Sequence, residues 1–331
     1  MTARTWAGVL VALVSAGLYG LIPPLARLGF EHGVPPHDAV AIRTVGLLAV
    51  SGLLVALFGS APSVPRRGWP WLAALSLSSA SVSICYLSAV SFISVGLAVI
   101  VFYTFPIVVL LLSPLLEGRP IGWTRLGLAL MAFAGLTVAI GPSLAALDWR
   151  GLALAGVASL SATAQFFSAR GISRCVASDE VHVFWTHLVM TPVLVATAFV
   201  LNGAPALAAF APGHATAIGI VALAGLCLSY VGGYLTQMRA LRQAPPSAVA
   251  PIFNIEPVVS LAVAGTFLGE TLTANQYAGG ALVVLALLLS GLIRRRHPLA
   301  AGPAAVQAGG EDTPEESCTA TPHENRPRRS R

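Results

Sequence analysis

Charged residues are scarce in this sequence. Only 10% of its 331 residues are Asp, Glu, Lys or Arg, whereas 56% are hydrophobic and the mean hydropathy is +0.80. Soluble proteins carry about 25% charged residues. The shortage of charge argues against an ordinary soluble domain and predicts an integral membrane protein.

Ten apolar stretches lie between clusters of charge, proline and glycine. Each is about the 20 residues that a helix rising 1.5 Å per residue needs to cross a hydrocarbon core of about 30 Å. The stretches are 6–27, 39–59, 69–90, 94–116, 122–141, 149–169, 181–201, 214–236, 246–268 and 274–293. We therefore expect an all-α integral membrane protein with ten transmembrane helices. The segment after them, rich in Pro, Ala, Glu and Arg, is predicted to be a disordered tail.

Lysine is absent altogether, so all 19 basic residues are arginines. If the N-terminus lies inside, twelve arginines near the ends of spans fall on the cytoplasmic side and only Arg27 and Arg150 fall outside. Cytoplasmic loops carry such an excess of basic residues. The bias predicts a multi-pass protein of the cell (plasma or inner) membrane with both termini in the cytoplasm. Because the arginines are spread along short loops, we expect no nucleic acid as partner.

Cysteine is sparse, and the familiar catalytic motifs are missing. Cys85, Cys175, Cys227 and Cys318 are scattered, with no pair at metal-ligand spacing. The sequence has no HExxH motif, no aspartate pair and no Gly-rich phosphate loop. We therefore expect no metal site, no cofactor, no enzymatic activity and no ATP-driven step in this chain.

The sequence repeats itself weakly. A shift of 151 residues aligns AVSFISVGLAVIVFYTFPIVVLLL with ALRQAPPSAVAPIFNIEPVVSLAV and pairs Phe102 with Phe253 and Pro106 with Pro257. A shift of 143 residues relates the starts of the two halves in the same way. Because each half holds five helices, an odd number, the second half must enter the membrane from the opposite side. This predicts an inverted-topology repeat with a ligand site near the midplane. The predicted domains are a first five-helix repeat over 1–145, a second over 146–293 and the cytoplasmic tail over 294–331.

Several motifs resemble those of EamA-type transporters in the drug/metabolite transporter superfamily. They are AVAIRTVGLLAV with its intramembrane Arg43, FYTFPIVV in the fourth stretch, and NIEPVVSLAVAGTFLGETLTANQYAGGALVV near the end. The resemblance covers residues 6–293, although Arg119 stands in the first half where Glu270 stands in the second. It implies two EamA-like repeats and a plasma-membrane carrier. Such carriers are commonly exporters of amino acids, related metabolites or toxic small molecules, often driven by the proton gradient.

Glu256 stands near the centre of the ninth stretch, beside Pro257. A carboxylate at mid-bilayer costs roughly 2.5–3.5 kcal/mol unless it faces water or a partner. Pro251 and Pro257 interrupt the helical hydrogen bonds, so this helix is expected to kink or loosen. In one interpretation, Glu256 and Asn254 form part of a substrate or proton site at the midplane. In the other, Glu256 is a buried carboxyl group, protonated or hydrogen-bonded, that holds the helix to its neighbours.

The other polar side chains inside the apolar stretches also have two interpretations. Arg43 either snorkels to the outer surface or faces a cavity, where its planar guanidinium attracts an anionic group. Tyrosine and glutamine side chains at mid-depth either line the cavity or form packed interhelical hydrogen bonds. His187 either relays protons or is a satisfied histidine near the interface. The candidate substrate-binding residues are Tyr103, Tyr230, Asn254, Glu256, Tyr86, Gln165 and Arg43.

Two functions from different classes fit these features. The first is a secondary carrier, an exporter of amino acids, amines or drug-like compounds that works by alternating access in the lipid bilayer, with possible proton coupling. The second is a membrane scaffold or receptor-like protein without transport activity, for which the charged tail would suit a partner. A channel fits less well, because the polar lining is sparse and no ring of like charges occurs. The AGGALVV face of the tenth stretch resembles a small-residue packing surface and suggests a homodimer.

Overall fold

Helices make up nearly all of the protein that the structure, a computed structural model, describes. The described residues are 3–58, 63–118, 122–141, 148–202, 215–267 and 271–296, and no strand occurs among them. The helices are α1 (Ala3–Gly20), α2 (Ile22–Glu31), α3 (Pro36–Leu57), η1 (Arg66–Gly68), α4 (Trp69–Ala89), α5 (Val95–Phe102), α6 (Phe105–Leu116), α7 (Trp123–Ile140), α8 (Trp149–Cys175), α9 (Asp179–Asn202), α10 (Ala217–Gln243), α11 (Pro246–Val249), η3 (Ala250–Ile255), α12 (Glu256–Phe267) and α13 (Ala274–Arg296). Arg119, Glu270 and the predicted tail beyond residue 296 lie outside the described residues.

Nine helical segments within the described ranges are long and apolar enough to cross a membrane. They coincide with the first nine apolar stretches of the sequence. The tenth stretch forms α13, whose apolar part, Ala274–Ser290, is shorter. The structure therefore agrees with an all-helical, multi-pass membrane protein, and the count of ten spans stays a prediction.

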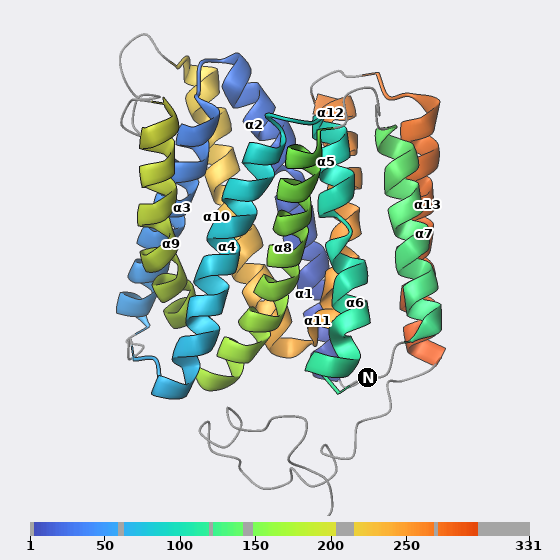
Figure 1. Cartoon of the computed structure of the whole chain (residues 1–331), viewed down its shortest axis with the longest axis horizontal. Helices are drawn as coiled ribbons and strands as arrows, with labels where there is room; N and C mark the ends of the chain where they lie inside the picture. Colours follow the sequence, from blue (N-terminus) through green and yellow to red (C-terminus); the bar gives the residue numbers. More distant parts are fainter. Residues whose placement is uncertain are drawn as a thin grey trace, which may run out of the picture.

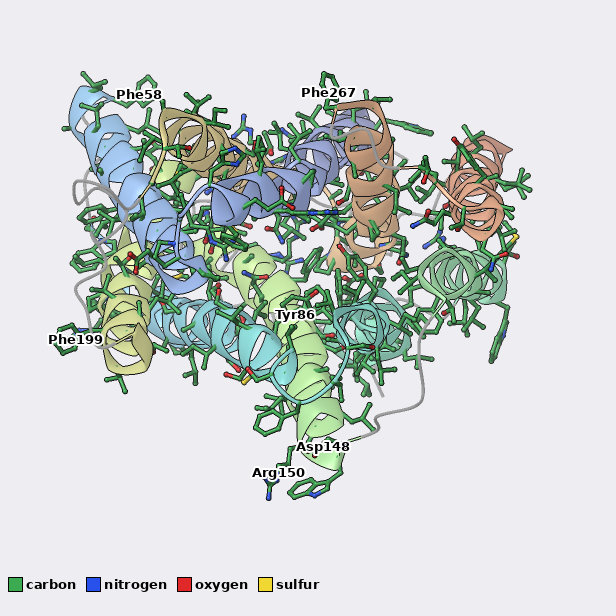
Figure 2. The ribbon with its side chains drawn as sticks, turned by 90° about the horizontal axis from the view of Figure 1, so that it is seen from above. Phe58, Tyr86, Asp148, Arg150, Phe199 and Phe267 are labelled. Atoms are coloured by element: carbon green, nitrogen blue, oxygen red, sulfur yellow. The ribbon has the colours of Figure 1, made fainter. Side chains whose placement is uncertain are left out.

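Large apolar side chains are exposed around the bundle. Leu77 and Leu115 are 74% and 72% exposed, and Phe58, Phe199 and Phe267 stand at its rim when it is seen from above (Figure 2). A soluble monomer rarely exposes so much apolar surface. In a bilayer, the same side chains contact lipid tails at no cost.

Three of the spans are broken, each next to proline. One is divided between α1 and α2, the second between α5 and α6, and the third among α11, η3 and α12. Pro23, Pro106 and Pro257 each lie in the first turn after a break, where the missing N–H group interrupts no helical hydrogen bond. The ninth stretch is loosened, as its prolines predicted, because Ala250–Ile255 forms a 3-10 helix.

The two halves of the chain interleave. The most extensive contacts join α4 to α8, α1 to α10, α3 to α9 and α7 to α13. In the order of the two halves, α1 corresponds to α8, α3 to α9, α4 to α10 and α7 to α13. If the halves are exchanged, the α4–α8 contact therefore becomes the α10–α1 contact, while the α3–α9 and α7–α13 contacts each remain the same pair. These last two pairs stand at opposite edges of the bundle (Figure 1).

The α7–α13 pair packs backbone against backbone. A Cβ atom on Gly279 of α13 would lie 2.3 Å from the carbonyl oxygen of Gly135 and 2.4 Å from the amide nitrogen of Ala139. Glycine is therefore needed for this approach. Gly279 belongs to the AGGALVV face that suggested a homodimer, but this part of the face already packs against α7 of the same chain. A homodimer remains a prediction.

Ion pairs tie together the end of α8, the start of α9 and the end of α10. The guanidinium of Arg242 pairs with the carboxylate of Asp179. Its Nη1 also donates to the carbonyl oxygens of Val176 and Ala177, both at 2.9 Å. Arg239 approaches the same carboxylate at 3.3 Å. Asp179 and Arg242 together thus hold three segments of the second half at one end of the bundle.

Candidate functional site

The breaks between α5 and α6 and before α12 bring Tyr103 and Glu256 together. Tyr103 is the C-cap residue of α5, and Glu256 is the first residue of α12. Their side chains lie close enough to interact, with the phenol O–H of Tyr103 as the donor and the Glu256 carboxylate as the acceptor. Tyr103 is only 5% exposed, so this contact is shielded from solvent. Because both residues stand at breaks next to proline, the same backbone irregularity positions one side chain from each half.

Arg43 of α3 brings a positive charge to the same region. Its Cζ atom lies 4.5 Å from the centroid of the Tyr230 ring, a distance at which a cation–π contact contributes about 0.5–2 kcal/mol. The guanidinium also interacts electrostatically with the Glu256 carboxylate. Its buried Nε finds no hydrogen-bond partner in the described part of the chain. This geometry agrees with an Arg43 that faces inward and disagrees with snorkelling to the outer surface.

A continuous chain of aromatic rings connects the two halves at this level. The centroids of successive rings lie 5.2–6.4 Å apart, within the range that edge-to-face and offset pairs prefer. We call this the aromatic chain, and its members in order are Tyr86, Phe102, Phe105, Phe166, Phe253, Tyr19 and Tyr230. Tyr86, at one end of it, lies inside the bundle (Figure 2). The Tyr103 ring packs edge-to-face against Phe102, with the ring centroids 5.3 Å apart.

The phenylalanines of the aromatic chain were not among the candidates from the sequence. A phenylalanine in an apolar stretch is ordinary, so composition alone does not distinguish Phe166 from any other. One signal was available, since Phe102 and Phe253 coincide under the shift of 151 residues. They lie at the two breaks, and both rings belong to the aromatic chain.

The hydroxyl group of Tyr230 is engaged by His187. His187 is fully buried, and its Nδ1 lies 3.0 Å from the carbonyl oxygen of Val183, a geometry in which the nitrogen must donate. The neutral ring then accepts at Nε2 from the Tyr230 hydroxyl, 3.3 Å away. His187 is therefore a satisfied, buried histidine that fixes the Tyr230 ring under Arg43.

Gln165 and Asn254 hold backbone and helices in place. Gln165 of α8 donates from Nε2 to the Ser79 hydroxyl of α4 at 2.9 Å, an interhelical packing bond. Asn254 donates from Nδ2 to the carbonyl oxygen of Pro251 at 3.1 Å and thereby stabilises η3. The Oδ1 atom of Asn254 is buried and has no partner in the described part of the chain. Asn254 thus keeps one acceptor available next to Glu256.

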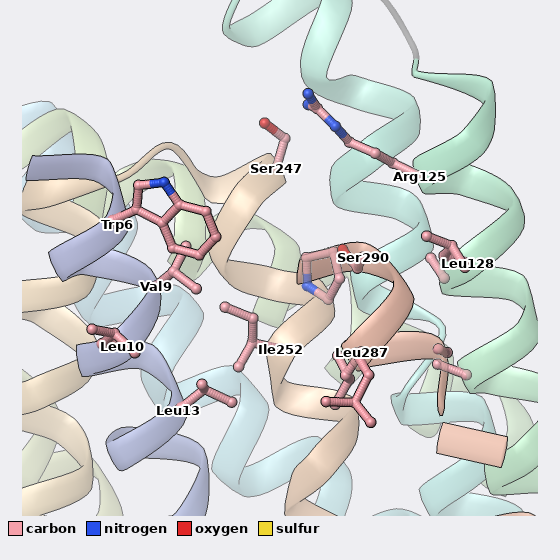
Figure 3. A pocket seen from close by; sticks show the side chains of 15 residues that line it. Trp6, Val9, Leu10, Leu13, Arg125, Leu128, Ser247, Ile252, Leu287 and Ser290 are labelled. Carbon is pink, nitrogen blue, oxygen red and sulfur yellow. The ribbon is translucent and has the colours of Figure 1, made fainter. Parts of the chain in front are cut away.

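A pocket of about 410 Å³ lies beside this cluster, between α1, α7, η3 and α13 (Figure 3). None of the seven candidate substrate-binding residues lines it. It touches their neighbourhood only through Pro251 and Ile252 of η3. Among the described residues, no group of three or more His, Cys, Asp or Glu side chains is placed to hold a metal ion.

Comparisons with known proteins agree with this architecture. The model of the EamA-like transporter family matches residues 6–141 and 149–292, one match in each half. A curated relative from Archaeoglobus fulgidus, described as an uncharacterized transporter, is 25% identical over 280 residues, which cover 82% of this chain and 95% of that protein. A solved crystal structure of 18% identity has a TM-score of 0.73 and covers 88% of this chain and 98% of its own. At 18% identity, the similarity to this crystal structure shows a shared fold only.

Proposed function

The chain belongs to the EamA-like transporter family and is a membrane transporter, and on this premise we propose that it is a secondary carrier working by alternating access. It exports small metabolites, such as amino acids, amines or drug-like compounds, from the cytoplasm across the cell membrane. Both termini lie in the cytoplasm, on the side to which the arginine bias points. The observation that carries the proposal is the cluster of Tyr103, Arg43, Tyr230 and Glu256 at paired helix breaks.

The exchange of helix contacts between the halves supports an inverted repeat of five helices over residues 1–145 and 146–293. An interface of this kind is unchanged when the halves trade places, so two conformations related by that exchange have similar contacts and similar energies. Carriers with inverted repeats place their substrate near the midplane, where discontinuous helices meet. The broken helices α5–α6 and η3–α12 supply that meeting point here.

The charges at the breaks support a substrate with a polar end and an apolar body. Glu256 attracts an amino group, and Arg43 attracts a carboxylate or other anionic group. The aromatic chain, with Tyr86 and Tyr230 at its ends, offers ring faces to the apolar part. Gln165 contributes indirectly by keeping α4 and α8 together.

Proton coupling is the finer part of the proposal and rests on Glu256. A carboxylate beside a buried guanidinium can be neutralised by a proton or by a cationic substrate group, and only one of the two can occupy it at a time. Protonation of Glu256 would then exchange with substrate binding, which links the proton gradient to transport. His187, satisfied at both ring nitrogens, stabilises Tyr230 and takes no part in this exchange.

The test is flux into proteoliposomes of a mixed pool of labelled amino acids and amines, with and without an imposed pH gradient. We expect saturable, gradient-sensitive flux, and loss of the gradient sensitivity in Glu256→Gln. The matched control is Glu31→Gln, because Glu31 is an exposed carboxylate whose ion pair with Arg27 lies at the surface. This control is expected to transport as the wild type does.

Three outcomes separate the parts of the proposal. Full flux with an unchanged pH profile in Glu256→Gln would remove the proton coupling and leave the carrier. Loss of flux in both variants would show that the effect is not specific to the site. Absence of flux for every compound from folded, monodisperse protein would contradict these substrate classes and favour the scaffold function.

A further inference from the structure

A carboxylate of the first half caps a helix of the second half. Glu117 directly follows α6, and its Oε1 and Oε2 atoms accept from the N–H and the O–H of Ser247, at 3.0 and 2.5 Å. Ser247 lies in the first turn of α11 and is 3% exposed. The first N–H groups of a helix have no partner within it, and the N-cap residue of α11, Pro245, forms no side-chain cap. Glu117 therefore supplies this cap across the boundary between the halves.

This contact lies at the end of the bundle where α1 begins, which we call the α1 end. Helix α11, the end of α6 and the N-terminus lie together on the lower side of the bundle (Figure 1). Ser247 and Trp6, in the first turn of α1, line the same pocket (Figure 3). In the proposed function the α1 end faces the cytoplasm. A carrier that opens to the cytoplasm separates its halves at this end, so the contact between Glu117 and Ser247 must then break.

At the opposite end of the bundle, the sequence does not allow the same contact. Under the shift of 151 residues that relates the halves, Glu117 corresponds to Leu268, which has no carboxylate. Ser247 corresponds to Gly96, which has no hydroxyl group. The counterpart of α11 in the first half is α5, and its cap comes from its own half, because Oγ of Ser94 accepts from a backbone N–H of α5 at 3.3 Å. The cap supplied by the other half is thus a feature of the α1 end.

A neutral hydrogen bond joins the halves at the opposite end. The N–H of Thr216, just before α10, donates to the carbonyl oxygen of His32, just after α2, at 3.1 Å. Hydrogen bonds to a carboxylate are about twice as strong as bonds between neutral groups, and Glu117 accepts two. An inverted repeat alone gives the two access states similar energies. This imbalance between the ends therefore favours the state in which the α1 end is closed.

We propose that Glu117 and Ser247 form a latch that holds the α1 end closed and sets the balance between the two access states. The latch rests on the proposed function. An exporter loads its substrate from the cytoplasm, so each transport cycle includes release of the latch. Ser247 stands at the start of the irregular segment α11–η3–α12, which also carries Glu256. Opening of the α1 end is thereby coupled to the position of the Glu256 carboxylate.

The test measures distances between spin labels in the full chain, reconstituted without substrate, by pulsed electron paramagnetic resonance. The labels are attached to introduced unnatural amino acids, which leaves the native cysteines in place. One pair spans the α1 end, at Leu115 of α6 and Ala177 after α8. The other pair spans the opposite end, at Phe30 of α2 and Ile218 of α10. All four positions are exposed, and each pair joins the two halves.

Ser247→Ala removes the hydroxyl donor and leaves the carboxylate of Glu117 in place. We expect the ratio of molecules open at the α1 end to molecules closed there to rise about tenfold, the effect of losing one hydrogen bond to a charged group. The label distance at the opposite end should shorten, because alternating access closes one end as the other opens. Glu117→Gln should shift both distances in the same directions, and Ser247→Thr, which keeps a hydroxyl group, should behave as the wild type does.

The matched control is Ser113→Ala on α6. Ser113 is as buried as Ser247, but its hydroxyl donates to the carbonyl oxygen of Leu110 within the same helix, at 2.8 Å. Its removal breaks no bond between the halves, so both label distances should stay as in the wild type. Thermal unfolding checks that every variant is folded.

Three results would overturn the latch. They are unchanged distances in both Ser247→Ala and Glu117→Gln, an equal change in Ser113→Ala, and a longer distance at the α1 end without a shorter one at the opposite end. The last result would show only a local loosening of α11. Because no substrate is present, a shift of both distances supports the latch even if no tested compound is transported, and unchanged distances overturn it even if flux is observed.

Discussion

The contact between Gly20 and the first turn of α12 offers a sharp test of how the site is positioned. A Cβ atom on Gly20 would lie 2.7 Å from the Cβ of Val259 and 2.8 Å from the carbonyl oxygen of Glu256. Both distances are shorter than real Cβ contacts, so Gly20→Ala must push α1 and α12 apart by roughly 0.6 Å to restore ordinary contact. The displaced residue would be Glu256 itself.

The energetic cost can be bounded. Overpacking by one methyl group costs about 1–3 kcal/mol, and alanine recovers up to about 1 kcal/mol of helix propensity relative to glycine. We therefore expect Gly20→Ala to lower the free energy of unfolding by roughly 1–2 kcal/mol, or about 2–4 °C in melting temperature per kcal/mol. Because the carboxylate moves, flux should fall by more than the loss of folded protein explains.

The measurement combines thermal unfolding in detergent with flux per folded molecule in proteoliposomes. Gly17→Ala is the control, because a Cβ at Gly17, three residues earlier on α1, meets nothing within 4 Å. That variant should be as stable as the wild type or more stable. If Gly20→Ala matched Gly17→Ala in both stability and flux, α1 would not constrain α12, and the argument would be refuted.

Two further variant pairs test the packing at other places. Gly279→Ala should destabilise the protein by about 1–3 kcal/mol, because its methyl group would meet the backbone of Gly135. The control is Gly280→Ala, which should cost nothing, because a Cβ atom there lies 3.7 Å from the nearest side-chain atom, on Val258. Equal melting temperatures of the two variants would contradict the close α7–α13 contact. Asp179→Asn removes the charge that several basic side chains share and should cost roughly 1.5–3 kcal/mol, measured by thermal unfolding. Glu31→Gln breaks an exposed ion pair and should cost less than about 0.5 kcal/mol. A larger loss of stability in Glu31→Gln than in Asp179→Asn would refute the role of Asp179 in holding these segments together.

The sequence predicted well whatever depends on the chain locally. Hydropathy located the apolar stretches because each helix must satisfy its own backbone in lipid, and the prolines of the ninth stretch located its irregular segment because a missing N–H group acts within one turn. The α-helical class and the loosened ninth helix follow from these local rules. The small-residue face of α13 was also recognised as a packing surface.

Local sequence patterns could not predict which way a polar side chain points or which residue it contacts. Depth along a helix gives no information on which way Arg43 points, since snorkelling and inward orientation start from the same Cα position. The same holds for His187, whose two hydrogen bonds depend on the rotation of α9 against α10, and for Gln165, which is used in packing between α4 and α8. The contact of Gly279 with α7 also depends on tertiary packing.

The glycine contact between α7 and α13 limits how the protein can deform. Two backbones that leave no room for a methyl group cannot slide past one another without first separating, so any low-energy displacement carries both helices together as one rigid strut. Its contacts with α1 and η3 are far less extensive, and the space between strut and bundle is the 410 Å³ pocket. The volume of that pocket should therefore change when the α7–α13 pair moves relative to the rest of the bundle. Two distance labels, one on α13 and one on α1, would report this movement, whereas two labels on α7 and α13 would not.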